Sequence, residues 1–205
     1  MKYREILLEQ LKKQPYFTKD AFFQLGEQFG LKNATMDSYI SRSLKRKDIV
    51  HLKNGLYVSA SFFDENKDDI AYSFYIANVL RQPSYISSWT ALQYYNLITE
   101  IVYVTTSVTV KVTKTYRTKI GSFSYQSIKD EMFTDFHLIK GKYDFFIASP
   151  AKALFDLLYF KTRRFNGMSL NDVKSLIASL RVDFDEIDEN EQEKFFSMIK
   201  KYAIK

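Results

Sequence analysis

Residues 34–58, ATMDSYISRSLKRKDIVHLKNGLYV, decide the fold of the first third of this chain. Three apolar side chains recur at four-residue spacing, which is typical of the buried stripe of a helix. They are Met36, Ile40 and Leu44. Runs rich in β-branched and aromatic residues then flank Asn54-Gly55, a pair that favours a hairpin because both residues tolerate positive φ. The stretch therefore predicts a helix over about residues 34–47, followed by a β-hairpin.

Two further helices are expected before this stretch. Residues 3–13 repeat apolar side chains at helical spacing, and Thr18 is a good N-cap for a second helix that Gly30 closes. A helix, a helix–turn–helix and a hairpin follow one another in the winged helix–turn–helix fold, where the third helix is the recognition helix and the hairpin is the wing. We therefore predict a winged helix–turn–helix DNA-binding domain over residues 1–60.

The rest of the chain predicts a second domain. Residues 61–69 are polar and acidic after Phe63, and we interpret them as a linker. Residues 70–205 show helical periods on both sides of a block rich in Val, Ile, Thr, Tyr and Phe. The strands expected in this block are residues 101–106, 109–113, 116–127, 136–139 and 143–147. The helices expected around it are residues 70–81, a segment through residues 89–95, a helix opened by Ser149-Pro150, and residues near 169–180 and 189–203. We predict an α+β protein whose C-terminal domain is mixed α/β, with an antiparallel-type sheet and C-terminal helices.

The positive charge is concentrated in the predicted winged helix. The chain has 30 Lys and Arg against 24 Asp and Glu, a net charge of +6. Residues 1–60 hold 11 of these cations and 6 of the anions, whereas residues 61–205 hold 19 and 18. The first segment therefore carries +5 and the second +1, which places the expected nucleic-acid contact on the first.

Composition excludes several other classes of protein. The chain has 0 Cys, which excludes disulfide scaffolds, thiolate nucleophiles and cysteine-ligated metal sites. The N-terminal residues MKYREILLEQLKK lack the apolar stretch of a signal peptide, and no apolar run approaches the roughly 18–20 residues of a membrane span. We expect a cytoplasmic protein that has no membrane partner.

The exposed face of the third helix carries side chains that suit DNA. With Ile40 buried, Ser38 and Arg42 point almost directly away from the core. Arg42 is the best candidate for a guanine contact, because its planar fork can bond O6 and N7 together. The predicted DNA-binding residues are Thr35, Ser38, Tyr39, Arg42, Lys45 and Arg46 on the helix, and His51, Lys53 and Asn54 on the wing. An ordinary interpretation of the terminal cations also stands, since cations in a last helical turn complement the helix dipole.

Two other charged segments each allow two interpretations. A basic stretch, Lys111, Lys114, Arg117 and Lys119, has no acid between Glu100 and Asp130. It suits either an accessory surface for nucleic acid or protein or the solvated face of an edge strand that resists aggregation, and we favour the second interpretation. Residues 182–193 carry seven acids and no base, which indicates either an acidic helix start or a contact with a basic partner.

The sequence contains few residues or motifs that indicate catalysis. G-x-S-x-G, HExxH, Walker A and G-x-G-x-x-G motifs are all absent. Asp183, Asp185 and Glu186 form an acidic group, but acids at a helix start are usually solvated. We predict that the protein is not an enzyme and needs no metal ion or cofactor.

Four segments carry a resemblance to a known family. They are residues 54–58 (NGLYV), 85–92 (YISSWTAL), 102–106 (VYVTT) and 148–158 (ASPAKALFDLL). With these segments in the family's order, the whole chain resembles the AbiEi-type antitoxins of bacterial type IV (abortive-infection) toxin–antitoxin systems. Two positions depart from the family pattern, because Ala151 replaces an acid and Thr90 replaces a serine. Within the last segment, Lys152 and Asp156 form an i, i+4 pair.

The resemblance implies a protein with two tasks. The N-terminal domain would bind inverted repeats in double-stranded DNA of its own promoter and repress the operon. The C-terminal domain would counteract a nucleotidyltransferase-like toxin encoded alongside, and the type IV definition does not require a direct complex. The alternative is a stand-alone winged-helix transcriptional regulator with a C-terminal sensing or interaction domain.

Overall fold

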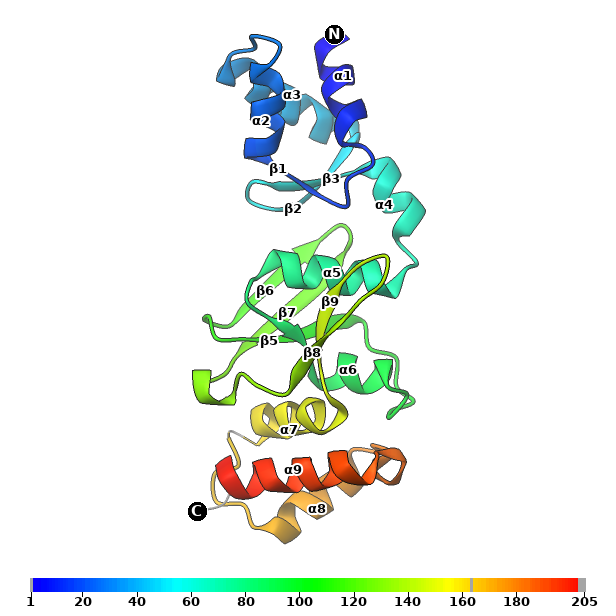
Figure 1. Cartoon of the computed structure of the whole chain (residues 1–205), viewed down its shortest axis with the longest axis vertical. Coiled ribbons are helices and arrows are strands. Elements are labelled where there is room, and N and C mark those ends of the chain that lie inside the picture. Colours follow the sequence, from blue (N-terminus) through cyan, green and yellow to red (C-terminus); the bar gives the residue numbers. More distant parts are fainter. Residues whose placement is uncertain (1, 163, 203–205) are drawn as a thin grey trace. The chain divides into compact units, whose positions relative to one another are not determined.

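The structure is a computed structural model that describes residues 2–162 and 164–202. Within these residues the protein is α+β, with a three-stranded antiparallel sheet and a six-stranded mixed sheet (Figure 1). The chain divides into two compact units. The first unit is the chain up to Ser73 together with Tyr116–Gly121, and the second unit is the remainder.

The first unit contains the helices and the hairpin predicted from the sequence. Its helices are α1 (Lys2–Leu11), α2 (Lys19–Glu27), α3 (Asn33–Arg46) and α4 (Ala60–Asn66). The smaller sheet has the order β1-β3-β2, with β1 (Phe17–Thr18), β2 (Ile49–Lys53) and β3 (Leu56–Ser59). Strand β1 was not predicted, because two residues give no periodicity; Phe17 pairs with Tyr57. The segment predicted as a linker, residues 61–69, is helical as far as Asn66.

Local chemistry explains how α2 meets α3. The hydroxyl of Thr18 accepts a hydrogen bond from the backbone N–H of Ala21 at 3.0 Å, which caps α2 as predicted. Gly26 allows the two helices to approach closely, since a Cβ there would collide with the buried side chain of Met36. Met36 belongs to one hydrophobic core with Phe22 and Ile40. This core holds α3 by one face and leaves its opposite face to solvent.

We expect Thr18→Ala to lower the free energy of unfolding by about 1 kcal/mol, because the first turn of α2 loses its side-chain acceptor. Urea denaturation of the full chain measures this change. Ser41→Ala, at an exposed position within α3, is the control and should change stability by less than about 0.5 kcal/mol. Equal losses from both variants would contradict the role of the cap.

The larger sheet lies mostly in the second unit, although its residues 116–118 and 121 belong to the first. Its strands are β4 (Tyr85–Ile86), β5 (Val104–Thr109), β6 (Lys114–Thr118), β7 (Gly121–Ser127), β8 (Phe136–Ile139) and β9 (Phe145–Ala148). The strand order is β6-β7-β5-β4-β9-β8. The β4–β5 and β8–β9 pairs are antiparallel, whereas β5–β7 and β4–β9 are parallel. The prediction of an antiparallel-type sheet is therefore wrong for the β5–β7 and β4–β9 pairs. Strands β5 and β6 are consecutive in sequence, but β7 lies between them in the sheet.

Two of the expected strands also differ from the structure. Residues 116–127 were predicted as one strand, but a turn at Lys119-Ile120 divides them between β6 and β7. The hydroxyl of Thr118 stabilises this turn by accepting a hydrogen bond from the N–H of Ile120 at 3.1 Å. Residues 110–113, expected to be extended, instead form the connection that carries the chain from β5 to β6.

The helices around the larger sheet lie in more than one layer (Figure 1). They are α5 (Ile70–Leu80), α6 (Ser88–Tyr94), α7 (Pro150–Lys161), α8 (Leu170–Ser179) and α9 (Glu189–Tyr202), with single 3₁₀ turns η1 (Asp130–Met132) and η2 (Phe184–Glu186). Figure 1 shows α7 between the sheet and the α8–α9 pair, and every residue from Ala151 to Tyr159 is buried. Among the described residues, no helix has the length and apolar character needed to cross a membrane.

Candidate nucleic-acid interface

The outer face of α3 presents most of the predicted contact residues. Ser38, Arg42, Lys45 and Arg46 are exposed, and Thr35 and Tyr39 are partly buried. The Ser38 hydroxyl donates a hydrogen bond to the carbonyl of Ala34 at 2.9 Å, so its oxygen still has capacity to accept. Helix α3 ends at Lys47, which adopts a left-handed conformation with φ 62° and turns the chain into β2.

A basic hollow lies beside this face of α3. It has a volume of about 420 Å³ and is lined by Arg4, Tyr39, Arg42, Lys45 and Arg46. We call this space the basic hollow and define it by these five lining residues. The structure thus brings together four of the predicted residues and adds Arg4 from α1, which sequence reasoning missed. Arg4 lies at helical spacing before the buried Leu7 and Leu11, and a cation on an apolar stripe was the signal that could have revealed it.

Arg4 is held in place by an ion pair. Its Nη1 atom lies 2.7 Å from the Asp48 carboxylate and donates to the Ser43 hydroxyl at 3.4 Å. Arg4 itself is buried, so this pairing offsets the cost of removing its charge from water. The guanidinium is therefore a fixed wall of the basic hollow rather than a mobile surface cation.

The cations that α3 contributes to the basic hollow are available to an anion. In the part of the chain that the structure describes, no carboxylate pairs with Arg42, Lys45 or Arg46. A concave surface lined by several cations suits the phosphate groups of a nucleic-acid backbone. The planar fork of Arg42 additionally suits a guanine edge.

The acidic side chain on this helix is engaged elsewhere. Asp37 lies 2.6 Å from the ammonium of Lys19 on α2. The hydrogen bond from Lys19 to Asp37 raises the pKa of Lys19 above its ordinary value. Since the carboxylate is neutralised by this pair, it opposes an approaching phosphate less than a solitary acid would.

The predicted wing residues do not line the basic hollow. His51 is exposed and its ring contacts that of Tyr57, its partner across the hairpin, at a centroid distance of 5.5 Å. Lys53 is partly buried, and Asn54 is exposed in the turn, where Gly55 has φ 72°. A β-bulge lies between His51 and Lys53.

None of the cations in the basic stretch of the β block lines the basic hollow. The four cations of this stretch are exposed: Lys111, Lys114, Arg117 and Lys119. Two of them lie on β6, and β6 is an outer strand of the larger sheet. This position favours the interpretation that the cations protect a sheet edge.

The acidic group near the C-terminus surrounds a wide groove. Asp183, Asp185 and Glu186 line a space of about 950 Å³ together with Lys174 and Phe196. The described residues include no group of three or more potential metal-ligating side chains close enough to hold an ion.

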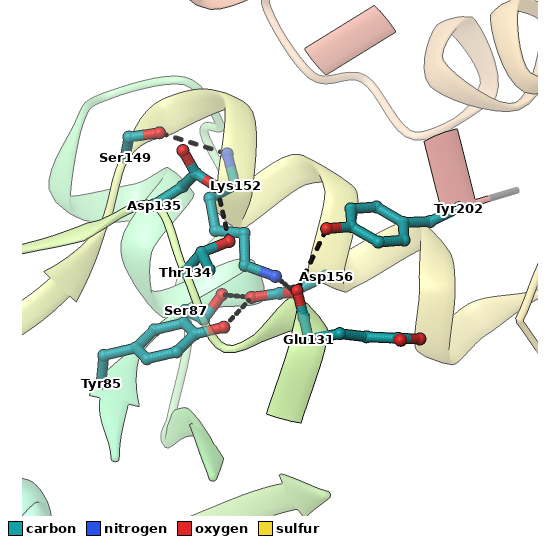
Figure 2. Close-up of polar contacts among 9 residues, drawn as sticks. All are labelled: Tyr85, Ser87, Glu131, Thr134, Asp135, Ser149, Lys152, Asp156 and Tyr202. Carbon is teal, nitrogen blue, oxygen red and sulfur yellow. Dashed lines mark hydrogen bonds and ion pairs between the residues drawn. The ribbon is translucent and has the colours of Figure 1, made fainter. Parts of the chain in front are cut away.

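A second polar cluster lies inside the larger unit, as Figure 2 shows. The Lys152 ammonium lies 2.6 Å from one oxygen of Asp156. The other oxygen accepts hydrogen bonds from the hydroxyls of Tyr85 at 3.0 Å and Ser87 at 2.7 Å. We call these four residues the buried ion-pair cluster.

Burial determines what the buried ion-pair cluster can do. Lys152 is 1% exposed, and the other three residues are 0% exposed. Burial raises the pKa of the Asp156 carboxyl, and burial together with the Asp156 charge raises the pKa of Tyr85. Although serine, lysine, tyrosine and aspartate are residue types found in catalytic sites, a substrate cannot reach them here. The cluster therefore links α7 to β4 and to the start of α6 as a structural element.

Comparison with models of known protein families and with curated proteins finds no match to this chain. Of the surfaces described above, the basic hollow beside α3 has the clearest chemical preference, which is for a polyanion.

Proposed function

We propose that this protein is a cytoplasmic DNA-binding antitoxin that represses its own operon and counteracts a nucleotidyltransferase-like toxin. Residues 1–60 form the winged helix–turn–helix domain in this proposal, with α3 as recognition helix and the β2–β3 hairpin as wing. The domain binds inverted repeats in the double-stranded DNA of its own promoter. The observation that carries the DNA-binding half is the basic hollow, in which α3 presents Arg42, Lys45 and Arg46 with no acid paired to them among the described residues.

The order of elements supports the same half of the proposal. Helix α2 is capped by Thr18 and packs closely on α3, and a hairpin follows α3 directly. Core residues hold the inner face of α3, so its outer face is presented on a rigid support. Such support is what base readout by an exposed helix requires.

The antitoxin half rests on the resemblance of the four segments to the AbiEi-type family. In this proposal residues 70–205 form the part that counteracts the toxin, without a stable complex between the two proteins. The competing function is a stand-alone transcriptional regulator. Co-expression with the product of the neighbouring gene separates the two, because rescue of growth supports the antitoxin. Failure of rescue with DNA binding intact supports the stand-alone regulator.

We expect the full chain to bind a duplex taken from the DNA upstream of its own gene with a steep salt dependence. Each phosphate neutralised contributes about −0.9 to the slope of log K against log salt concentration. If Arg42, Lys45 and Arg46 each neutralise one phosphate, the slope is about −3 per protein chain. Fluorescence anisotropy over a salt series measures it. Absence of binding at low salt, or a slope near zero, would refute the proposal.

A further inference from the structure

The second unit contains an aromatic cavity that the proposed function does not use. It has a volume of about 420 Å³ and lies among α5, the loop after it, and the β8–β9 pair. Its apolar walls are Tyr75, Val79, Pro83, Phe133, Phe136 and Phe146. This volume falls within the roughly 300–1,000 Å³ of typical small-molecule pockets.

Contacts between aromatic rings support the walls of the aromatic cavity. Phe136 stacks on the buried Tyr85 at a centroid distance of 4.6 Å and meets Phe133 edge-on at 5.0 Å. Phe146 meets Phe136 edge-on at 5.8 Å but remains 41% exposed. An aromatic side chain that is anchored at one edge and open at the other offers a ready contact for a second ring.

A buried amide ties the three sides of the aromatic cavity together. The Asn78 side chain donates to the carbonyl of Ser84 at 3.3 Å and accepts from the backbone N–H of Phe146 at 2.7 Å. These two bonds join α5 to the loop and to β9. Because the framework is set by hydrogen bonds within the core, a ligand would bind without ordering the cavity first.

Ser84 adds a polar residue to the lining of the aromatic cavity. Ser84 is 5% exposed, and its hydroxyl has no hydrogen-bond partner among the described residues. A buried hydroxyl without a partner is destabilising. The hydroxyl oxygen is itself buried, so a rotation of the Ser84 side chain toward the cavity would bring it to a ligand's donor or acceptor and relieve this cost.

We propose that the aromatic cavity binds a small, neutral aromatic molecule that carries one hydrogen-bonding group, such as an amide. The ring would pack against Phe136 and Phe146, and the polar group would reach Ser84. A charged ligand is disfavoured, because most of the exposed surface of the lining is apolar and cannot replace the water around the charge. An anion is opposed further by the carboxylate of Asp144, which also lines the cavity.

Three probes of similar size test the proposal on the full chain. Benzamide has the ring and the neutral amide, benzoate replaces the amide by a charge, and cyclohexanecarboxamide removes the aromatic ring. We expect benzamide to bind with a Kd of about 1 mM and to shift the backbone amide signals of Val79, Ser84 and Phe146 in NMR titrations. Benzoate should bind about tenfold more weakly, and cyclohexanecarboxamide about threefold or more.

Variants distinguish the aromatic cavity from the surface of the same unit. Phe146→Ala should weaken benzamide binding about tenfold, and Val79→Phe should abolish it by filling the space. Tyr103→Ala removes an aromatic ring that is 85% exposed and lies outside the cavity, so it should leave binding unchanged. Benzoate binding as tightly as benzamide, signal shifts elsewhere, or folded Phe146→Ala and Val79→Phe variants with unchanged affinity would each overturn the proposal. None of these residues lines the basic hollow, so failure here is distinguishable from failure of DNA binding.

Discussion

Replacing Asp156 by alanine is expected to lower the free energy of unfolding by about 3–5 kcal/mol, because it leaves the ammonium of Lys152 buried without a counter-charge. The distance of 2.6 Å between the two groups and their near-complete burial place them in the class of pairs for which this cost applies. Many domains have only about 5–15 kcal/mol of stability in total. Urea denaturation monitored by circular dichroism would therefore detect a large shift of the midpoint.

Two controls show whether the unpaired charge causes the loss. The double variant Lys152→Met with Asp156→Leu removes both charges and should regain most of the stability, because a buried ion pair is often replaceable by apolar side chains. Lys194→Ala breaks the ion pair between the exposed Lys194 of α9 and Glu191, whose carboxylate lies 2.6 Å away, and should cost less than about 1 kcal/mol. A double variant as unstable as Asp156→Ala would contradict the explanation.

The first unit was largely predictable because its signals are local. The four-residue spacing of Met36 and Ile40, the Thr18 cap and the Asn54-Gly55 turn each act within a few residues, and all appear in the structure. Strand β1 has two residues and depends on its pairing with β3, so no local sequence pattern predicts it. Arg4 is held at the basic hollow by Asp48, which lies 44 positions further along the chain. The spacing of residues in the sequence does not predict a contact at such a distance.

The second unit was harder to predict because its arrangement is set by distant pairings. The composition of residues 101–147 indicated strands, but composition cannot specify that β7 runs parallel to β5 or that β4 lies between β5 and β9. The i, i+4 spacing of Lys152 and Asp156 could be seen in the sequence. The near-complete burial of the two side chains, in contrast, depends on how the sheet and α9 enclose α7. The aromatic cavity likewise joins residues from α5 and β8–β9 that are far apart in sequence.

Replacing Arg42 by alanine is expected to weaken binding to the operator by about 1–3 kcal/mol and to reduce discrimination between operator and unrelated DNA. The side chain is exposed, lines the basic hollow and has no acidic partner among the described residues, so its loss should leave folding unchanged. Fluorescence anisotropy with the upstream duplex and with a scrambled duplex of equal length measures both effects.

Two further substitutions test what Arg42 contributes. Arg42→Lys keeps the charge but loses the planar fork, so the salt dependence should persist while discrimination falls. Lys53→Ala, on the wing, should weaken binding to both duplexes by a similar factor, because a contact to the phosphate backbone carries no sequence information. If Arg42→Ala and Lys53→Ala cause equal and small losses on both duplexes, α3 is not the helix that reads the operator. The basic hollow would then bind only phosphate, because its cations would lie beside the DNA backbone and away from the base edges.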